Sequence, residues 1–345
     1  MARDYFKRVK ELTPTRFWIN NVTRDEANWA IEAGAIGCTQ NPSYVNKMIQ
    51  NEQMRGKVDE LIRKYRAEGH STEEIMVFVQ RDLVLDIARI FKDIYDKTNG
   101  RCGYVSIQGD PFHEDAETII RCALLNTADL PNMMAKVPVT EEGLKAIRVL
   151  AARGVPINAT EVMSVRQALD VCEVYAEATR GMEKKAPIYY SHITGILDQY
   201  LTAYAKDNNI DINRDVLWQA GIAAAKKTYH LCKKANPEVG FIGGGARGLQ
   251  HFTEMVGADA NITINWKGTA DKLLEADYPV VERFHMPTPD YVIDELLEKL
   301  PDYPKAFMVN GIKPEEYEDF GPVVLFRSTF EQNWQAALEY IENLK

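Results

Sequence analysis

Short apolar runs alternate with longer segments of helical periodicity along most of the chain. Each run ends in polar or turn-forming residues and is apolar on both faces, which is typical of strands buried in a parallel sheet. We predict strands at 16–20, 35–40, 104–108, 132–137, 154–160, 186–191, 239–244 and 261–265. Because a helical segment follows each strand, the pattern predicts a parallel sheet covered by helices.

Capping residues mark where several of these helices begin. Thr23 is followed three residues later by Glu26, and Ser71 by Glu74, which are capping-box spacings. We predict helices over 4–12, from Thr23 to Gly34, over most of 43–98 with a new start at Ser71, over 113–126 and 140–153, from Ser164, over 195–207, 214–235 and 247–256, and after Gly268.

Repeated strand–helix units of this number and length, roughly 250 residues in all, are typical of a (β/α)8 barrel. We therefore predict an α/β fold, a (β/α)8 TIM barrel with extra helices, over residues 1–280. A doubly wound open sheet has the same alternation and is the alternative. Residues 281–345 contain further helices with proline-rich joints, and we predict a helical C-terminal extension packed on the barrel.

Composition narrows the classes of partner and compartment. The net charge is −9 and no basic run occurs, which argues against nucleic acid or an anionic membrane as a partner. No apolar run reaches the roughly 18 residues of a membrane helix, and residues 1–14 lack the apolar segment of a signal peptide. The five cysteines never form a CxxC pair, which predicts free thiols in a cytoplasmic protein rather than a disulfide framework or a metal site. A homo-oligomer is compatible with the sequence.

One cation, Lys136, stands inside a predicted apolar strand. Burial disfavours the charged form of a lysine, and the neutral amine is a nucleophile toward a carbonyl carbon. The alternative is a lysine that reaches solvent at the strand end or forms a structural ion pair.

Polar residues stand at the C-terminal ends of the predicted strands, where (β/α)8 barrels carry their catalytic groups. They are Asn20, Asn21, Thr39, Gln40, Asn41, Gln108, Asp110, Lys136, Asn158, Thr160, Ser191, His192, Gly244, Gly245, Arg247 and Asn265. Any one alone is more often a turn or cap residue, but their joint placement indicates a site.

A glycine-rich segment, 243–248, follows the seventh predicted strand. Glycines let backbone N–H groups approach an anion at a helix N-terminus, and Arg247 can add paired hydrogen bonds to a phosphate. A structural turn with a surface arginine is the alternative. His192 is either an anion ligand or proton carrier, or a packing residue.

Five stretches carry a family signature: WINNVTR at 18–24, GCTQNPS at 37–43, YDKTNGRCGYVSIQ at 95–108, PNMMAKVPVTEEGL at 131–144 and INAT at 157–160. Together they resemble the transaldolase family, and most closely its longer bacterial members, over about 15–275. The resemblance implies a (β/α)8 fold, no cofactor, a sugar or sugar-phosphate substrate, and a role in carbohydrate metabolism such as the pentose phosphate pathway. It also implies a lysine that forms a Schiff base with a ketose, and Lys136 occupies that position.

The chain departs from the family pattern where protons are handled. Asn20 replaces an aspartate at the end of strand one, and Gln108 replaces a glutamate on strand three, although related fructose-6-phosphate aldolases also carry glutamine there. An amide cannot gain or lose a proton near neutral pH. The candidates for the missing proton donor are Asp110, Glu161, Tyr190 and His192, of which His192 and Glu161 rank first.

Two further departures concern substrate binding. Gln40 replaces the second threonine of the family's TTNPS segment, and residues 190–198 lack the arginine with which the family holds a sugar phosphate. Arg247 is then the one remaining arginine of that kind.

The resemblance assigns roles residue by residue. The predicted catalytic residues are Lys136, Asn20, Gln108 and Thr160, and the predicted substrate-binding residues are Thr39, Asn41, Asn158, Ser191, His192 and Arg247. The leading hypothesis is a transaldolase-like transferase that moves a dihydroxyacetone unit, or an aldolase that releases it. The alternatives are a diverged lyase or isomerase acting on a modified sugar, and a catalytically impaired homologue that binds sugars.

Overall fold

The computed structural model describes residues 3–344, in which eight parallel strands close into one barrel in sequential order. The strands are β1 (Arg16–Asn20), β2 (Cys38–Thr39), β3 (Val105–Gln108), β4 (Met133–Pro138), β5 (Ile157–Val162), β6 (Ile188–His192), β7 (Val239–Gly243) and β8 (Asn261–Asn265). Pairing of β1 with β8 along their full lengths closes the sheet. The predicted (β/α)8 barrel is therefore confirmed, and the open-sheet alternative is wrong.

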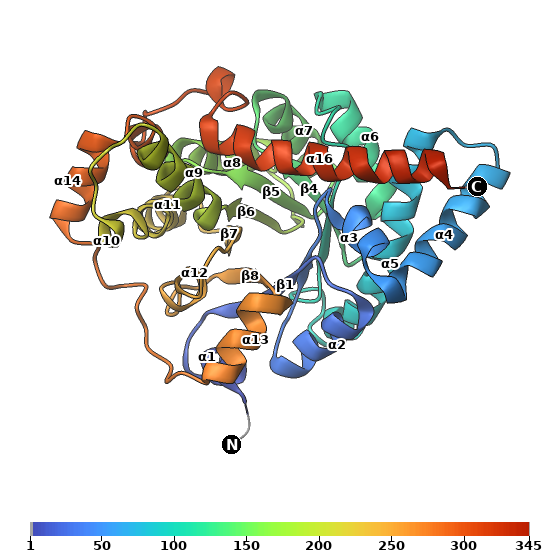
Figure 1. Ribbon diagram of the computed structural model, residues 1–345, viewed down its shortest axis with the longest axis horizontal. Coiled ribbons are helices and arrows are strands. Elements are labelled where there is room, and N and C mark those ends of the chain that lie inside the picture. Colours follow the sequence, from blue (N-terminus) through green and yellow to red (C-terminus); the bar gives the residue numbers. More distant parts are fainter. Residues whose placement is uncertain (1–2, 345) are drawn as a thin grey trace.

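Helices follow the strands and surround the barrel (Figure 1). They are α1 (Tyr5–Leu12), α2 (Arg24–Ala33), α3 (Tyr44–Gln50), α4 (Glu52–Ala67), α5 (Thr72–Lys97), α6 (Ala116–Thr127), α7 (Glu141–Ala152), α8 (Val165–Ala178), α9 (Thr194–Asp207), α10 (Arg214–Leu217), α11 (Ala220–Ala235), α12 (Gln250–Thr253), α13 (Asp271–Ala276), α14 (Asp290–Lys299), α15 (Tyr303–Phe307) and α16 (Gly321–Asn343). Short irregular helical turns lie at Trp266–Ala270 and Pro314–Glu316.

The capping residues act as the sequence predicts. Thr23, Ser71 and Ser164 each form a complete capping box at the start of α2, α5 and α8. These side chains satisfy backbone N–H groups that have no partner within the helix. The local sequence therefore fixes where these helices begin.

Three predicted helical segments differ from the structure. Within 43–98 a further helix, α4, begins after the capping residue Asn51. The segment 214–235 is divided into α10 and α11, because the N–H group of Gly221 donates to the buried Asp198 side chain at the start of α11. The predicted helix over 247–256 is reduced to the single turn of α12. The N–H groups of Arg247 and Gly248, which precede α12, donate to Nδ1 of His251.

The barrel interior toward the N-terminal ends of the strands is packed with large apolar side chains. Trp18, Met134, Ile242 and the half-buried Tyr189 belong to this interior cluster, while the residues beside them in each strand pack outward against the helices. Gly37 makes room, because a Cβ atom there would overlap the Trp18 indole. Within the described barrel, a cavity lies at the C-terminal ends of the strands, above this apolar packing.

Helix α16 runs across the molecule from α9 to α3 and α5, and it touches the end of β5 (Figure 1). The helical nature of the C-terminal segment agrees with the prediction. The boundary between 1–280 and 281–345 stays a prediction, and the outermost residues of those ranges, 1, 2 and 345, lie outside the described part. Within 3–344, no helix is both long and apolar enough to cross a membrane.

Candidate active site

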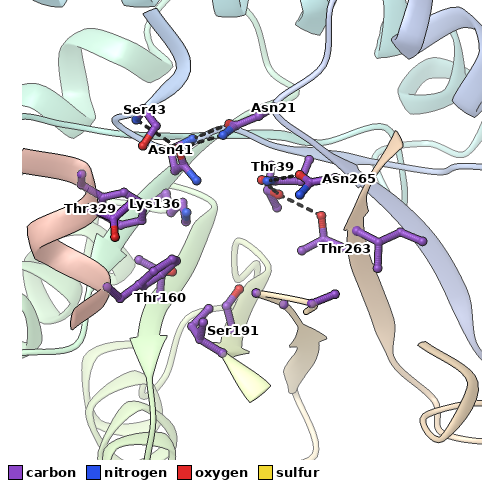
Figure 2. A pocket seen from close by; sticks show the side chains of 18 of the residues that line it. Asn21, Thr39, Asn41, Ser43, Lys136, Thr160, Ser191, Thr263, Asn265 and Thr329 are labelled. Atoms are coloured by element: carbon purple, nitrogen blue, oxygen red, sulfur yellow. Dashed lines mark hydrogen bonds between the residues drawn. The ribbon is translucent and has the colours of Figure 1, made fainter. Parts of the chain in front are cut away.

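A cavity of about 330 Å³ lies at the C-terminal ends of the strands and is bordered by α16 (Figure 2). The predicted site residues that line it are Asn20, Thr39, Asn41, Lys136, Thr160, Ser191 and Arg247. Three other predicted site residues, Gln108, Asn158 and His192, are buried outside this lining. The structure therefore gathers most of the predicted side chains around one lysine.

Lys136 is the buried cation of the cavity. It lies in β4, 7% exposed, and the ring of Phe330 from α16 lies 5.8 Å from its Nζ atom. Burial lowers the pKa of Lys136 from 10.5 to about 8, while the nearby Glu161 charge acts in the opposite direction. A substantial fraction of this amine is therefore neutral and nucleophilic close to physiological pH.

The β1–β8 side of the cavity carries amides and hydroxyls. Asn20 Oδ1 accepts a hydrogen bond of 2.8 Å from the Thr39 hydroxyl, and Asn20 Nδ2 donates to Asn265 Oδ1 at 2.9 Å. The Thr39 hydroxyl also lies 2.8 Å from that of Thr263. These groups can orient a hydroxyl group of a ligand but cannot act as a general acid or base near neutral pH.

Asn41 is fixed by a reciprocal pair of hydrogen bonds. Asn21 donates from Nδ2 to Asn41 Oδ1 at 2.8 Å, and its own Oδ1 accepts from the Asn41 backbone at 3.0 Å. The backbone N–H of Ser43 also donates to Asn41 Oδ1. Because its oxygen is occupied, Asn41 offers a ligand its Nδ2 group.

A polar layer lies below the cavity floor. Ser191 donates to Asn158 Oδ1 at 2.6 Å, and Asn158 donates in turn to the hydroxyl of Ser106 at 3.1 Å. Asn158 is thus a support for Ser191 rather than part of the lining. Thr160 is fully buried at the cavity, and its hydroxyl has no hydrogen-bond partner among the described residues.

The carboxyl group of Glu161, in β5, is buried near Lys136. Gln108 donates from Nε2 to Glu161 Oε1 at 2.8 Å, and both side chains are buried. Glu114, just before α6, borders a smaller cavity that Gln108 and Lys136 also line. Burial raises the pKa of Glu114, as does the neighbouring Glu161 charge.

His192 does not take part in the cavity. It follows Ser191 in β6, so its side chain points to the opposite face of the sheet. Its Nδ1 atom lies 3.3 Å from the Thr194 hydroxyl, and burial lowers its pKa to about 3. The geometry therefore contradicts the expectation that His192 binds substrate or carries protons there.

The glycine-rich segment reaches the cavity, but its backbone is used internally. The N–H groups of Arg247 and Gly248 donate to His251 Nδ1, and His251 Nε2 donates to Asp198 at 2.8 Å. These two N–H groups are therefore not free to bind an anion, and the expectation that the segment 243–248 binds one stays a prediction. The exposed Arg247 side chain does line the cavity, and its Nε atom donates to Gln199 at 2.6 Å.

Charge and shape are set by residues that the sequence did not single out. Lys47 and Lys267 join Lys136 and Arg247 in the lining, and no carboxylate is found among the described lining residues. The cavity is therefore positive in a chain of net charge −9, which favours an anionic ligand.

Several lining residues were missed for identifiable reasons. They are Ser43, Lys47, Thr263, Lys267 and, in α16, Phe326, Thr329 and Phe330. Thr263 could have been found, because it alternates with Asn265 on one face of β8. The α16 residues gave no local signal, since helix-spaced aromatic residues indicate only a buried face. Residues 3–344 contain no cluster of His, Cys, Asp and Glu side chains that could hold a metal ion.

Comparison of the sequence with known proteins identifies a family. Residues 17–297 match the family model described as transaldolase/fructose-6-phosphate aldolase. A transaldolase of Saccharopolyspora erythraea is 31% identical over 167 residues, covering 46% of this chain and 44% of that protein. A transaldolase of Mycobacterium leprae is 26% identical over 241 residues, covering 63% of this chain and 61% of that protein. Transaldolase 1 of Streptomyces coelicolor is 26% identical over 239 residues, covering 66% and 58%.

The chain thus spans about half the length of the curated relatives it matches. The family match, in contrast, includes every strand of the barrel except the first residue of β1. On this evidence the chain belongs to the transaldolase/fructose-6-phosphate aldolase family.

Proposed function

We propose that this protein is a transaldolase-type Schiff-base enzyme that cleaves or forms a C–C bond of a ketose through Lys136. The observation that carries the proposal is the position of Lys136, buried in a strand and facing a cavity of hydroxyl and amide groups. Its lowered pKa supports a nucleophilic role. Family membership supports the same chemistry.

The reaction begins when the neutral amine attacks the ketose carbonyl carbon and forms a carbinolamine. Loss of the former carbonyl oxygen as water, after its protonation, leaves a C=N bond. When a base removes the proton of the C4 hydroxyl, the C3–C4 bond breaks, an aldehyde leaves, and the electron pair forms an enamine on Lys136. Attack of the enamine on a second aldehyde forms a new ketose imine, and hydrolysis of that imine completes a transfer. Protonation of the enamine followed by hydrolysis releases dihydroxyacetone instead. This sequence needs no cofactor.

The other cavity residues position the substrate. Thr39, Asn41 and Ser191 offer hydroxyl and amide groups to the sugar, and Thr160 can hold the water that imine formation releases. Arg247 and Lys267 supply positive charge for a distal anionic group. We therefore propose a ketose phosphate as the substrate class. The described cysteines are all free thiols, which supports action in a reducing compartment such as the cytoplasm.

Borohydride trapping tests the proposal. The protein is incubated with fructose 6-phosphate or dihydroxyacetone and reduced, and its intact mass and peptide map are determined. We expect a six-carbon or three-carbon adduct on Lys136 alone, and none after Lys136→Met. Lys145→Met, on the exposed face of α7, is the matched control and should retain the adduct. Native protein without any adduct, or with an adduct on another lysine, would refute the proposal.

One observation favours a second candidate function. On the β1–β8 side, Asn20 and its hydrogen-bond partners include no carboxyl group to accept the C4 proton. A protein of this kind would form the imine but cleave the C–C bond slowly, acting as a ketose-binding protein or on a modified sugar. Trapped adduct without release of aldehyde from fructose 6-phosphate would support this candidate.

A further inference from the structure

Strand β5 has a bulge beside the cavity. Two residue pairs flank it in register, Ala159–Tyr190 and Val162–His192. Between them Thr160 and Glu161 both lie opposite the single residue Ser191, whose side chain lines the cavity. Glu161 has φ 62°, a left-handed conformation that residues other than glycine seldom adopt. Because bulges redirect side chains, two consecutive residues of β5 face the barrel interior here.

The Glu161 side chain ends in a buried polar site. Gln108 of β3 donates a hydrogen bond to one carboxyl oxygen, Oε1. The other oxygen, Oε2, has no hydrogen-bond partner among the described residues, and the same holds for the Thr160 hydroxyl. Both side chains are fully buried. Buried polar atoms are normally paired with protein groups or water, so these two oxygens indicate a place for a water or a polar part of the ligand.

Charged groups from several elements face Glu161. Burial raises its pKa, and Glu331 of α16 raises it slightly further. The hydrogen bond from Gln108 and the charges of Lys136 in β4 and Arg327 in α16 lower it. Glu114 lies close enough for its own pKa to respond to the Glu161 charge. A carboxyl group with a raised pKa keeps its proton more readily than an ordinary carboxyl group, which suits it to act as an acid.

Building on the proposed Schiff-base function, we propose that Glu161 is the group that moves protons while the imine at Lys136 forms and is hydrolysed. The carboxylic acid gives its proton to the carbinolamine hydroxyl, the C–O bond breaks, water leaves, and the nitrogen lone pair forms the C=N bond. In hydrolysis the carboxylate takes a proton from the attacking water, whose oxygen bonds to the imine carbon. Atoms and charge balance within this pair of steps.

This assignment explains how Gln108 is compatible with turnover. The family resemblance places a carboxyl group on strand three, and here β3 carries an amide. Strands β3 and β5 flank β4 on its two sides. The carboxyl group therefore comes from β5 instead of β3, and Gln108 of β3 positions it through the 2.8 Å hydrogen bond.

The test measures the rate of imine formation with dihydroxyacetone, by quenching with borohydride at timed intervals and determining the adduct mass. We expect Glu161→Gln to slow the rate by about 10²-fold or more, the usual effect of removing a general acid or base. The final amount of adduct should stay near the native level, which a misfolded variant would not reach. Glu117→Gln, which removes an exposed carboxyl group from the first turn of α6, should leave the rate close to native.

A double variant separates proton transfer from structure. In Glu161→Gln combined with Gln108→Glu, the amide and carboxyl groups exchange places, and we expect most of the native rate to return. A Glu161→Gln rate equal to the native rate would overturn this inference while leaving the proposed function intact. Absence of any adduct in the native protein would overturn both.

Discussion

At the scale of single residues, the two sides of Lys136 differ in the chemistry they can support. Next to the strand of Lys136, Glu161 of β5 provides a carboxyl group, which Gln108 of β3 holds. Across the barrel, at β1 and β8, Asn20 and its partners provide only amides and hydroxyls. The loss of a general acid or base typically slows a reaction by about 10²–10⁴-fold. We therefore expect imine formation to be faster than C–C cleavage.

Restoring a carboxyl group at Asn20 should change the slow step. We expect Asn20→Asp to speed release of glyceraldehyde 3-phosphate from fructose 6-phosphate by about tenfold or more, because a carboxylate can accept the C4 proton. A coupled assay for the aldehyde measures this rate. Asn265→Asp is the matched control, since it places the same charge on the hydrogen-bond partner of Asn20. Equal acceleration by both variants would show that negative charge, not the position of the base, is responsible.

At the scale of single elements, side chains pack closely inside the barrel beneath the strand ends that carry the site. The ring of Trp18 fills the space beside Gly37, whereas Gly56 lies exposed in α4 with no heavy atom near the position of a Cβ. We expect Gly37→Ala to lower the free energy of unfolding by about 1–3 kcal/mol through overpacking. Gly56→Ala should raise it by about 0.5–1 kcal/mol, because alanine favours the helix. Urea denaturation measures both, and destabilisation by Gly56→Ala would contradict this account.

The elements also show what the sequence could predict and what it could not. Strand periodicity and capping residues such as Thr23 act within a few positions, so the order of elements and the placement of Lys136 at a strand end were predictable. The bulge at Glu161 adds one residue without changing the apolar pattern, so the strand predicted at 154–160 ended before it. The segment at α12 is held by His251, whose Nε2 atom lies 2.8 Å from Asp198 of α9. A contact between residues this far apart in the sequence leaves no local pattern.

At the scale of the whole molecule, α16 joins the end of the chain to its first third. Tyr340 donates to Asp59 at 2.7 Å, and Asn46 donates to Asn333 at 2.8 Å. In the part of α16 between α9 and these contacts, Phe326 and Phe330 border the cavity. The C-terminal extension therefore shapes the site from outside the barrel, which no local pattern in the sequence could reveal.

The position of Phe330 makes the reactivity of Lys136 depend on this helix. Burial holds the lysine pKa at about 8, and the Phe330 ring lies 5.8 Å from its Nζ atom. Phe330→Ala admits water, so the pKa should rise toward 10.5, and each unit lowers the neutral fraction at pH 7 about tenfold. We expect slower adduct formation with dihydroxyacetone at pH 7 and a pH–rate midpoint shifted upward, with little loss at high pH. Val324→Ala, on the exposed face of α16, should keep the native profile. An unchanged midpoint in Phe330→Ala would show that the barrel alone desolvates the lysine, because Glu161, the charged group that raises its pKa, remains in place.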